Sequence, residues 1–241
     1  MGIVSERGFT VIELMLFLGV TGALFAALMF GVNSNVTQER YNDSVSSYST
    51  LLQKQYSEVL NTLNQRGNDW KCADDGTITQ ETINGDPRGA TDCVILGRAV
   101  QVQDRGATIV TSSVVGKEPT QLDNSSDIAA LLAYHPKVTS FDEERSSIDW
   151  GSSLVSIDKQ PSSASFLILR SPASGLIRVF TSASALPADI SSVISKTDAL
   201  TKLTNCMLGD TGVQPIKSVS IDPRIASQDG VTVNQVDPQC N

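Results

Sequence analysis

The sequence predicts an α+β protein in which one long N-terminal helix is followed by a head built on antiparallel strands. Three observations predict this fold class: an apolar run over residues 9–32, a helical repeat of apolar residues that continues to about residue 65, and pairs of β-branched segments joined by short turns. The helix is expected to be a spine, with a lower half that crosses a membrane and an upper half packed against the sheet.

The apolar run over residues 9–32 is long enough to cross a membrane. At about 1.5 Å of rise per residue, a helix of this length spans roughly 36 Å, against a hydrocarbon core of about 30 Å. A cleaved signal peptide would have a positive start and an apolar stretch of about 7 to 15 residues, whereas here Glu6 offsets Arg7 and the run is longer. We therefore expect a transmembrane helix.

The helical pattern continues over residues 33–65 in amphipathic form, and no proline precedes Pro87. Gly67 and Asn68 supply a stop signal. The alternative to one continuous helix is that residues 33–65 form a separate amphipathic helix packed on a domain. The apolar positions of the pattern are Val36, Tyr41, Val45, Tyr48, Leu52, Tyr56, Val59 or Leu60, and Leu63.

Residues 66–241 form the predicted head. A turn-rich loop is bracketed by Cys72 and Cys93, and Asp104-Arg105-Gly106 joins two β-branched strands as a hairpin. The remaining predicted elements are a short helix at 125–136 that ends at a proline, a second strand pair at 165–171 and 175–182, a helix at 189–205, and two short strands at 217–223 and 230–238.

The four cysteines predict two disulfides formed outside the cytoplasm. They lie far apart without a C-x-x-C pair, and His135 is the one histidine, so a zinc site is disfavoured and no metal is expected. Of the three possible connectivities, Cys72–Cys93 and Cys206–Cys240 are favoured because each closes a loop within one region. Each loop would stabilise the fold by about 3 to 4 kcal/mol.

Composition and motifs argue against an enzyme and against a nucleic-acid binder. The net charge is -8 and no run of Lys or Arg occurs, so direct nucleic-acid binding is not expected. No nucleophile-elbow, dinucleotide-binding or P-loop motif is present, and His135 at a helix end has no neighbouring nucleophile, so we expect no catalytic residue and no cofactor.

Two further groups of residues have structural and functional interpretations. The acidic loop with Asp74, Asp75 and Glu81 lacks the EF-hand spacing, so the sequence gives no support for calcium binding. Trp70 and Trp150 lie in polar surroundings, where core packing is the usual role and exposure would make either a candidate for adhesion.

Glu13 is a carboxylate inside the apolar run. A charge near the centre of a membrane helix costs on the order of 3 kcal/mol, and less towards the edge, where the helix dipole also favours an anion. One explanation is that the Glu13 side chain snorkels, so that its carboxylate reaches the membrane surface. Ionisable residues in membranes usually have partners, however, and the segment itself offers none.

The stretch GFTVIEL, from Gly8 to Leu14, resembles the processing motif of type IV pilins and of the related pseudopilins of type II secretion. The resemblance implies a leader at residues 1–8, cleavage after Gly8 by a prepilin peptidase, and N-methylation of Phe9. It also implies that Glu13 pairs with the Phe9 amine of a neighbouring subunit, which would fix axial register in a filament.

The same resemblance implies partners, localisation and a fold. The partners are other pilin subunits in a helical filament, the peptidase, membrane lipid before assembly, and an inner-membrane assembly platform with its ATPase. The protein would be single-pass in the membrane before assembly and extracellular afterwards, in a pilus or pseudopilus. The head resembles the pilin ladle, with a C-terminal disulfide loop at 206–240.

The sequence departs from the pilin pattern in two ways. The membrane helix has no proline near Phe30, so a proline kink is not expected there, although Gly22 and Gly31 allow bending. The head has apparent insertions at 116–148 and 183–205, which favour a minor pilin or a larger pseudopilin over the repeating shaft subunit. Adhesion, motility and DNA uptake are the roles such a subunit would have. The alternatives are a major pilin, a pseudopilin, and a membrane-anchored extracellular binding protein or enzyme that uses the segment only for export.

Overall fold

The structure is a computed structural model of the 241-residue chain. The chain divides into two compact units, Met1–Asn42 and Asp43–Asn241. We call the second unit the head. The structure describes residues 10–61, 70–80, 92–121, 125–187, 189–196, 200–210, 216–235 and 237–240.

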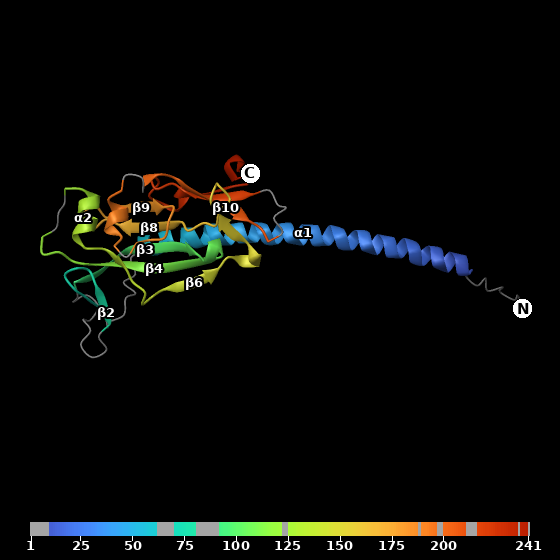
Figure 1. The fold of residues 1–241 in the computed structure, drawn as a ribbon, viewed down its shortest axis with the longest axis horizontal. Coiled ribbons are helices and arrows are strands. Elements are labelled where there is room, and N and C mark those ends of the chain that lie inside the picture. Colours follow the sequence, from blue (N-terminus) through green and yellow to red (C-terminus); the bar gives the residue numbers. More distant parts are fainter. Residues whose placement is uncertain are drawn as a thin grey trace, which may run out of the picture. The chain divides into compact units, whose positions relative to one another are not determined.

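Helix α1 runs without interruption over Val11–Leu60, so one helix contributes to both units (Figure 1). The predicted long helix is confirmed and is described as far as Leu60, whereas its predicted end near Gln65 lies outside the described residues. Asn61 stands in a turn and its side-chain amide donates to the Ser57 hydroxyl oxygen at 3.3 Å. The predicted stop signals Gly67 and Asn68 lie outside the described residues.

The head contains two main antiparallel sheets. The larger has the order β5-β4-β3-β8-β9, with β6 also paired to β4 (Figure 1). Both predicted hairpins, β3–β4 and β8–β9, are confirmed, whereas the short edge strands β5 and β6 were not predicted. The strands are β3 Cys93–Gln103, β4 Thr108–Lys117, β5 Lys137–Val138, β6 Glu144–Ser147, β8 Ser165–Arg170 and β9 Ile177–Ser182.

Strand alternation gives the larger sheet two buried faces. Arg98 of β3 contacts α1, whereas its neighbour Ala99 belongs to an apolar cluster with residues of α2, Asp127–Ala133, and α3, Ser191–Ile194. A bulge between Ile95 and Gly97 keeps Leu96 on the same face as Ala99. Both helices come from the two apparent insertions, so these segments complete the core of the head.

The smaller sheet has the order β12-β11-β10-β7. The prediction of strands near 217–223 and 230–238 is confirmed, but the prediction of a helix over 189–205 is wrong at its end, residues 203–205. Residues 203–205 instead begin β10, because they pair with β11. The strands are β7 Ser153–Val155, β10 Leu203–Leu208, β11 Lys217–Ile221 and β12 Val231–Asn234.

Glycine allows the two sheets to meet closely. The β3–β4 connection is the 3-10 turn η1, Asp104–Gly106, and it packs on β7. Gly106 has a φ of +86°, and a Cβ there would lie 1.9 Å from the carbonyl oxygen of Leu154. The remaining short turns are η2 Asp149–Gly151, η4 Gln228–Gly230 and η5 Pro238–Cys240.

The loop predicted between Cys72 and Cys93 contains a small hairpin, β1 Trp70–Cys72 with β2 Ile78–Gln80. Trp70 is buried with Cys93 and Val115, which fastens the hairpin to the larger sheet.

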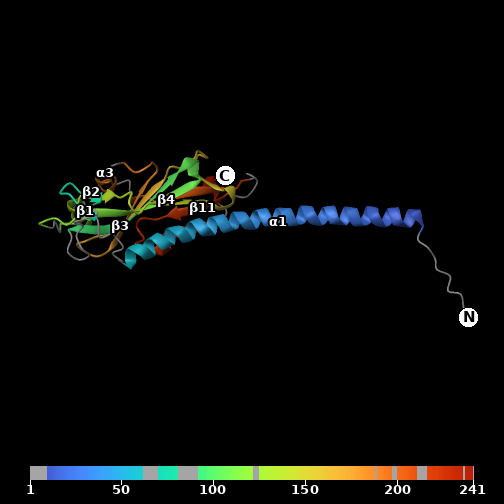
Figure 2. The same ribbon diagram turned by 90° about the horizontal axis from the view of Figure 1, so that it is seen from below.

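The part of α1 within the head lies along the strands (Figure 2). Its buried apolar residues recur at helical spacing, as the amphipathic pattern predicts, and Val59 rather than Leu60 takes the buried position. These buried residues are Val45, Tyr48, Leu52, Tyr56 and Val59.

Candidate functional site

Glu13 lies in the first turn of α1, where it forms a capping box with Thr10. The Thr10 backbone N–H donates to Glu13 Oε2 at 3.0 Å, and the Thr10 hydroxyl donates to the same oxygen at 3.1 Å. In return the Glu13 N–H donates to Thr10 Oγ1 at 3.3 Å. The two residues thus satisfy backbone N–H groups that the start of a helix leaves without partners.

The capping box gives Glu13 a role within its own helix. Sequence reasoning placed Glu13 in the site but missed Thr10, although the T-x-x-E spacing of residues 10–13 is a recognised signal. The carboxylate accepts two hydrogen bonds on one oxygen, so it has hydrogen-bond partners within its own helix.

The helix around Glu13 presents an apolar surface. Over residues 10–32, Glu13 is the one ionisable side chain, and the Thr21 hydroxyl donates to the Phe17 carbonyl oxygen at 2.7 Å. Among the described residues, α1 is the one helix with the length and composition to cross a membrane. Its exposed apolar side chains are Val11, Ile12, Leu14, Met15, Leu16, Phe17, Leu18, Val20, Leu24, Phe25, Leu28, Met29 and Val32.

The other residues of the predicted processing site, Gly8 and Phe9, lie outside the described residues. Gly22 and Gly31, which allow bending, are both inside the continuous helix.

Both disulfides join the pairs that the sequence favours. Cys72 and Cys93 have Cα atoms 5.3 Å apart, and Cys206 and Cys240 have Cα atoms 5.7 Å apart. The second bridge ties the chain end at η5 to β10, so it closes the predicted C-terminal loop.

The acidic loop residues pair with lysines. Asp74 contacts Lys117, whose ammonium group lowers the pKa of the carboxyl group below its usual value. Asp75 accepts hydrogen bonds from Thr77, which lower its pKa to about 2, and lies 3.3 Å from Lys137 Nζ. Within the described ranges no three His, Cys, Asp or Glu side chains gather as metal ligands would, and Glu81 lies outside them.

His135 and the two tryptophans have distinct environments. His135 adopts a φ of +47°, and its carbonyl oxygen faces Gly76, where a Cβ would approach it to 2.0 Å. Trp70 packs in the core beside Phe141, with ring centroids 5.9 Å apart. Trp150 is 52% exposed, and its indole N–H donates to Asp43 at 3.1 Å, so this tryptophan keeps the exposure expected of a contact residue.

A cleft of about 440 Å³ lies between α1 and strands β4 and β6. Its cations are engaged by neighbouring carboxylates, Lys54 by Glu58 and Arg145 by Glu143. No nucleophile and base converge on it among its lining residues, which are Ser46, Ser47, Thr50, Leu51, Lys54, Gln55, Thr111, Glu144, Arg145 and Ser146.

Fold and site together define an α+β protein with an apolar N-terminal helix, a capped carboxylate at the helix start and a head with two disulfides. Comparisons with protein-family models, curated proteins and solved structures found no match.

Proposed function

We propose that the chain is a structural subunit of a type IV pilus, a minor pilin, and has no catalytic activity of its own. The observation that carries the proposal is the placement of Glu13, the one ionisable side chain in the apolar part of α1 over residues 11–32, five residues after Gly8 in a sequence that resembles the prepilin motif. The ladle-like fold is part of the proposal, supported by the α1 segment that packs against antiparallel sheets.

The proposed assembly step uses the free amine that processing creates. Cleavage after Gly8 leaves a cationic α-amine on Phe9, which is then methylated. When apolar helices bundle, this amine meets Glu13 of a neighbouring subunit, and neither charge remains unpaired in an apolar environment. Losing one partner of such a pair costs about 3 to 5 kcal/mol, so assembly favours the one axial position that keeps it.

The capping box supports the competing function, a membrane-anchored extracellular binding protein. Thr10 and Glu13 satisfy each other within one helix, which explains the carboxylate without a second subunit. The two functions therefore differ in what they need from Glu13: its charge, or only its ability to cap.

Three substitutions separate these needs. Glu13→Gln retains a capping side chain but removes the charge, Glu13→Ala removes both, and Thr10→Ala removes the cap partner while keeping the charge. The experiment expresses each variant with the filament-assembly machinery of the native host and measures sheared fibres by immunoblot. Disulfide formation in the head serves as the control for folding.

The minor-pilin proposal expects Glu13→Gln and Glu13→Ala to lose incorporation into fibres, while Thr10→Ala retains most of it. Normal incorporation of Glu13→Gln contradicts the charge-pairing step. Absence of the parent chain itself from sheared fibres contradicts the pilin proposal and favours the anchored protein.

A further inference from the structure

The apolar face of α1 does not by itself determine where the helix sits along the head. Its buried residues recur every three or four positions, so a displacement by one turn, about 5.4 Å, would replace Tyr48 by Leu52 and Leu52 by Tyr56. At these two positions one apolar side chain would then occupy the place of another. A specific axial position needs contacts that only one register can satisfy.

The first such contact is at Ser44, which is fully buried. Its hydroxyl donates to the carbonyl oxygen of Asp149 in η2 at 2.8 Å, and it accepts a hydrogen bond from the Ser152 hydroxyl at 3.1 Å. Both partners belong to the connection between β6 and β7.

The second contact is at Tyr48. Its hydroxyl accepts a hydrogen bond from the Asn205 side-chain amide at 3.2 Å, and both residues are buried. The Asn205 carbonyl oxygen is in turn held by the Ser162 hydroxyl at 3.1 Å. Because Asn205 belongs to β10, this contact ties α1 to the smaller sheet.

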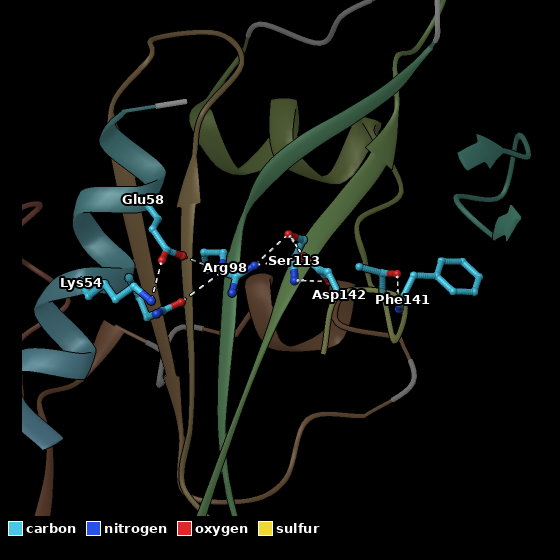
Figure 3. Close-up of polar contacts among 8 residues, drawn as sticks. Lys54, Glu58, Arg98, Ser113, Phe141 and Asp142 are labelled. Atoms are coloured by element: carbon cyan, nitrogen blue, oxygen red, sulfur yellow. Dashed lines mark hydrogen bonds and ion pairs between the residues drawn. The ribbon is translucent and has the colours of Figure 1, made fainter. Parts of the chain in front are cut away.

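The third contact is at Arg98 of β3, whose side chain is 13% exposed (Figure 3). Its Nε atom donates to Gln55 Oε1 at 3.0 Å and lies 3.2 Å from Glu58 Oε2. On the other side, Nη1 is 3.0 Å from both the Ser113 hydroxyl oxygen and Asp142 Oδ2. Arg98 is therefore fixed from the sheet side while it reaches two residues of α1.

A one-turn displacement breaks these contacts in either direction. If Lys54 took the place of Glu58, a second cation would lie against Arg98, and Ser44 would replace Tyr48 opposite Asn205. In the opposite direction, Leu52 would face Asn205 and Val59 would replace Gln55 beside Arg98. Buried polar groups would then lack partners, which is costly.

We infer that these three contacts, the polar seam formed by Ser44, Tyr48, Gln55 and Glu58 with their partners, lock α1 in one axial register on the head. The partners of α1 in the polar seam come from both sheets and from the β6–β7 connection. A movement of one strand alone therefore does not release the helix. The inference stands whether or not the chain assembles. If it does, the polar seam passes axial force on α1 to both sheets.

The test measures the position of α1 directly in the full chain in detergent. All four cysteines are in disulfides, so spin labels at Thr50→Cys on α1 and Thr232→Cys on β12, both exposed, would be specific. Pulsed electron resonance gives the distance between the labels. The parent is expected to show one narrow distance.

Removal of the polar seam in Ser44→Ala/Tyr48→Phe/Arg98→Met is expected to add a second distance, displaced by up to about one helical turn. The matched control is Ser46→Ala/Ser47→Ala, which removes exposed hydroxyls of α1 outside the polar seam and is expected to keep the parent distance. A folded seam variant with the single parent distance overturns the inference, as does an equal change in the control.

A charge exchange provides a second test that leaves Arg98 in place. In Lys54→Glu/Glu58→Lys with Ser44→Ala/Tyr48→Phe, the native register sets the new lysine at position 58 against Arg98, whereas a displaced register brings the new glutamate at position 54 there. We expect the distance to move towards the displaced register. An unchanged distance in this variant also overturns the inference.

Discussion

The buried tyrosine hydroxyls of α1 differ in one respect that bears on stability. Burial raises the pKa of both Tyr48 and Tyr56 above the usual range. The Tyr48 hydroxyl accepts a hydrogen bond from Asn205, whereas the Tyr56 hydroxyl has no hydrogen-bond partner within the described part of the chain. One hydroxyl thus compensates for its desolvation and the other does not.

Replacing each tyrosine by phenylalanine is expected to have opposite effects. Tyr56→Phe should raise the free energy of unfolding by about 1 kcal/mol, because it removes a buried group without a partner. Tyr48→Phe should lower it by about 1 to 2 kcal/mol, because it leaves the Asn205 amide without an acceptor. Urea unfolding followed by circular dichroism measures both; equal destabilisation by the two changes would contradict the assignment.

At the scale of elements, Asp127 fastens α2 to the larger sheet. It is the first residue of α2, its carboxylate accepts from the Ser171 hydroxyl at 2.7 Å and from Arg178 Nε at 2.8 Å, and its side chain is 12% exposed. Hydrogen bonds from Ser174, Ser171 and Arg178 lower its pKa to about 2.

This lowered pKa makes the anchor sensitive to acid. Because the folded state holds the pKa of Asp127 below its unfolded value of about 3.9, the carboxylate adds stability above about pH 4 and loses that contribution as the pH falls to about 2. Asp127→Asn should lower the free energy of unfolding at pH 7 by about 1 kcal/mol. The difference between parent and variant should shrink towards pH 2 in urea titrations; a constant difference would rule out the charged anchor.

Substitution of two glycines with positive φ distinguishes the cost of backbone strain from the cost of a close contact. A Cβ at Gly106 would lie 1.9 Å from the Leu154 carbonyl oxygen, whereas at Gly175 the nearest atom, on Arg170, is 3.8 Å away. Gly175→Ala should cost about 1 kcal/mol from conformation alone, and Gly106→Ala about 3 kcal/mol or more. Thermal unfolding compares the variants; similar losses would show that η1 does not depend on close packing with β7.

The elements that sequence predicts best are those with strong local signals. The turn residues at 104–106 mark the β3–β4 hairpin, and the amphipathic repeat marks α1. Strands β5 and β6 have no such signal, because they form by pairing with β4. The sequence predicts helix at the start of β10, residues 203–205, because apolar residues at 200 and 203 continue a helical spacing, which pairing with β11 overrides.

The residues of the candidate site and of the polar seam also differ in whether a local sequence signal predicts them. Glu13 is evident from sequence because a charge in an apolar run is unusual, and Thr10 could have been found from its capping spacing. The role of Arg98 could not be predicted, because Gln55 and Glu58 lie about forty residues earlier in the chain and only the fold brings them together.

At the scale of the whole molecule, the chain combines two kinds of surface. Residues 11–32 of α1 expose apolar side chains, whereas the head has a buried apolar core and contains two disulfides. An exposed apolar helix needs lipid or other helices around it. The proposed pilin supplies both in turn, membrane before assembly and a helix bundle afterwards.

The most direct measurement for this proposal is the intact mass of the protein purified from its native host under non-reducing conditions. The account predicts a chain of residues 9–241 that begins at Phe9, carries one methyl group on its amine and retains both disulfides. A chain that still begins at Met1, or one cleaved after the apolar run near Ala27 or Gly31, would contradict it.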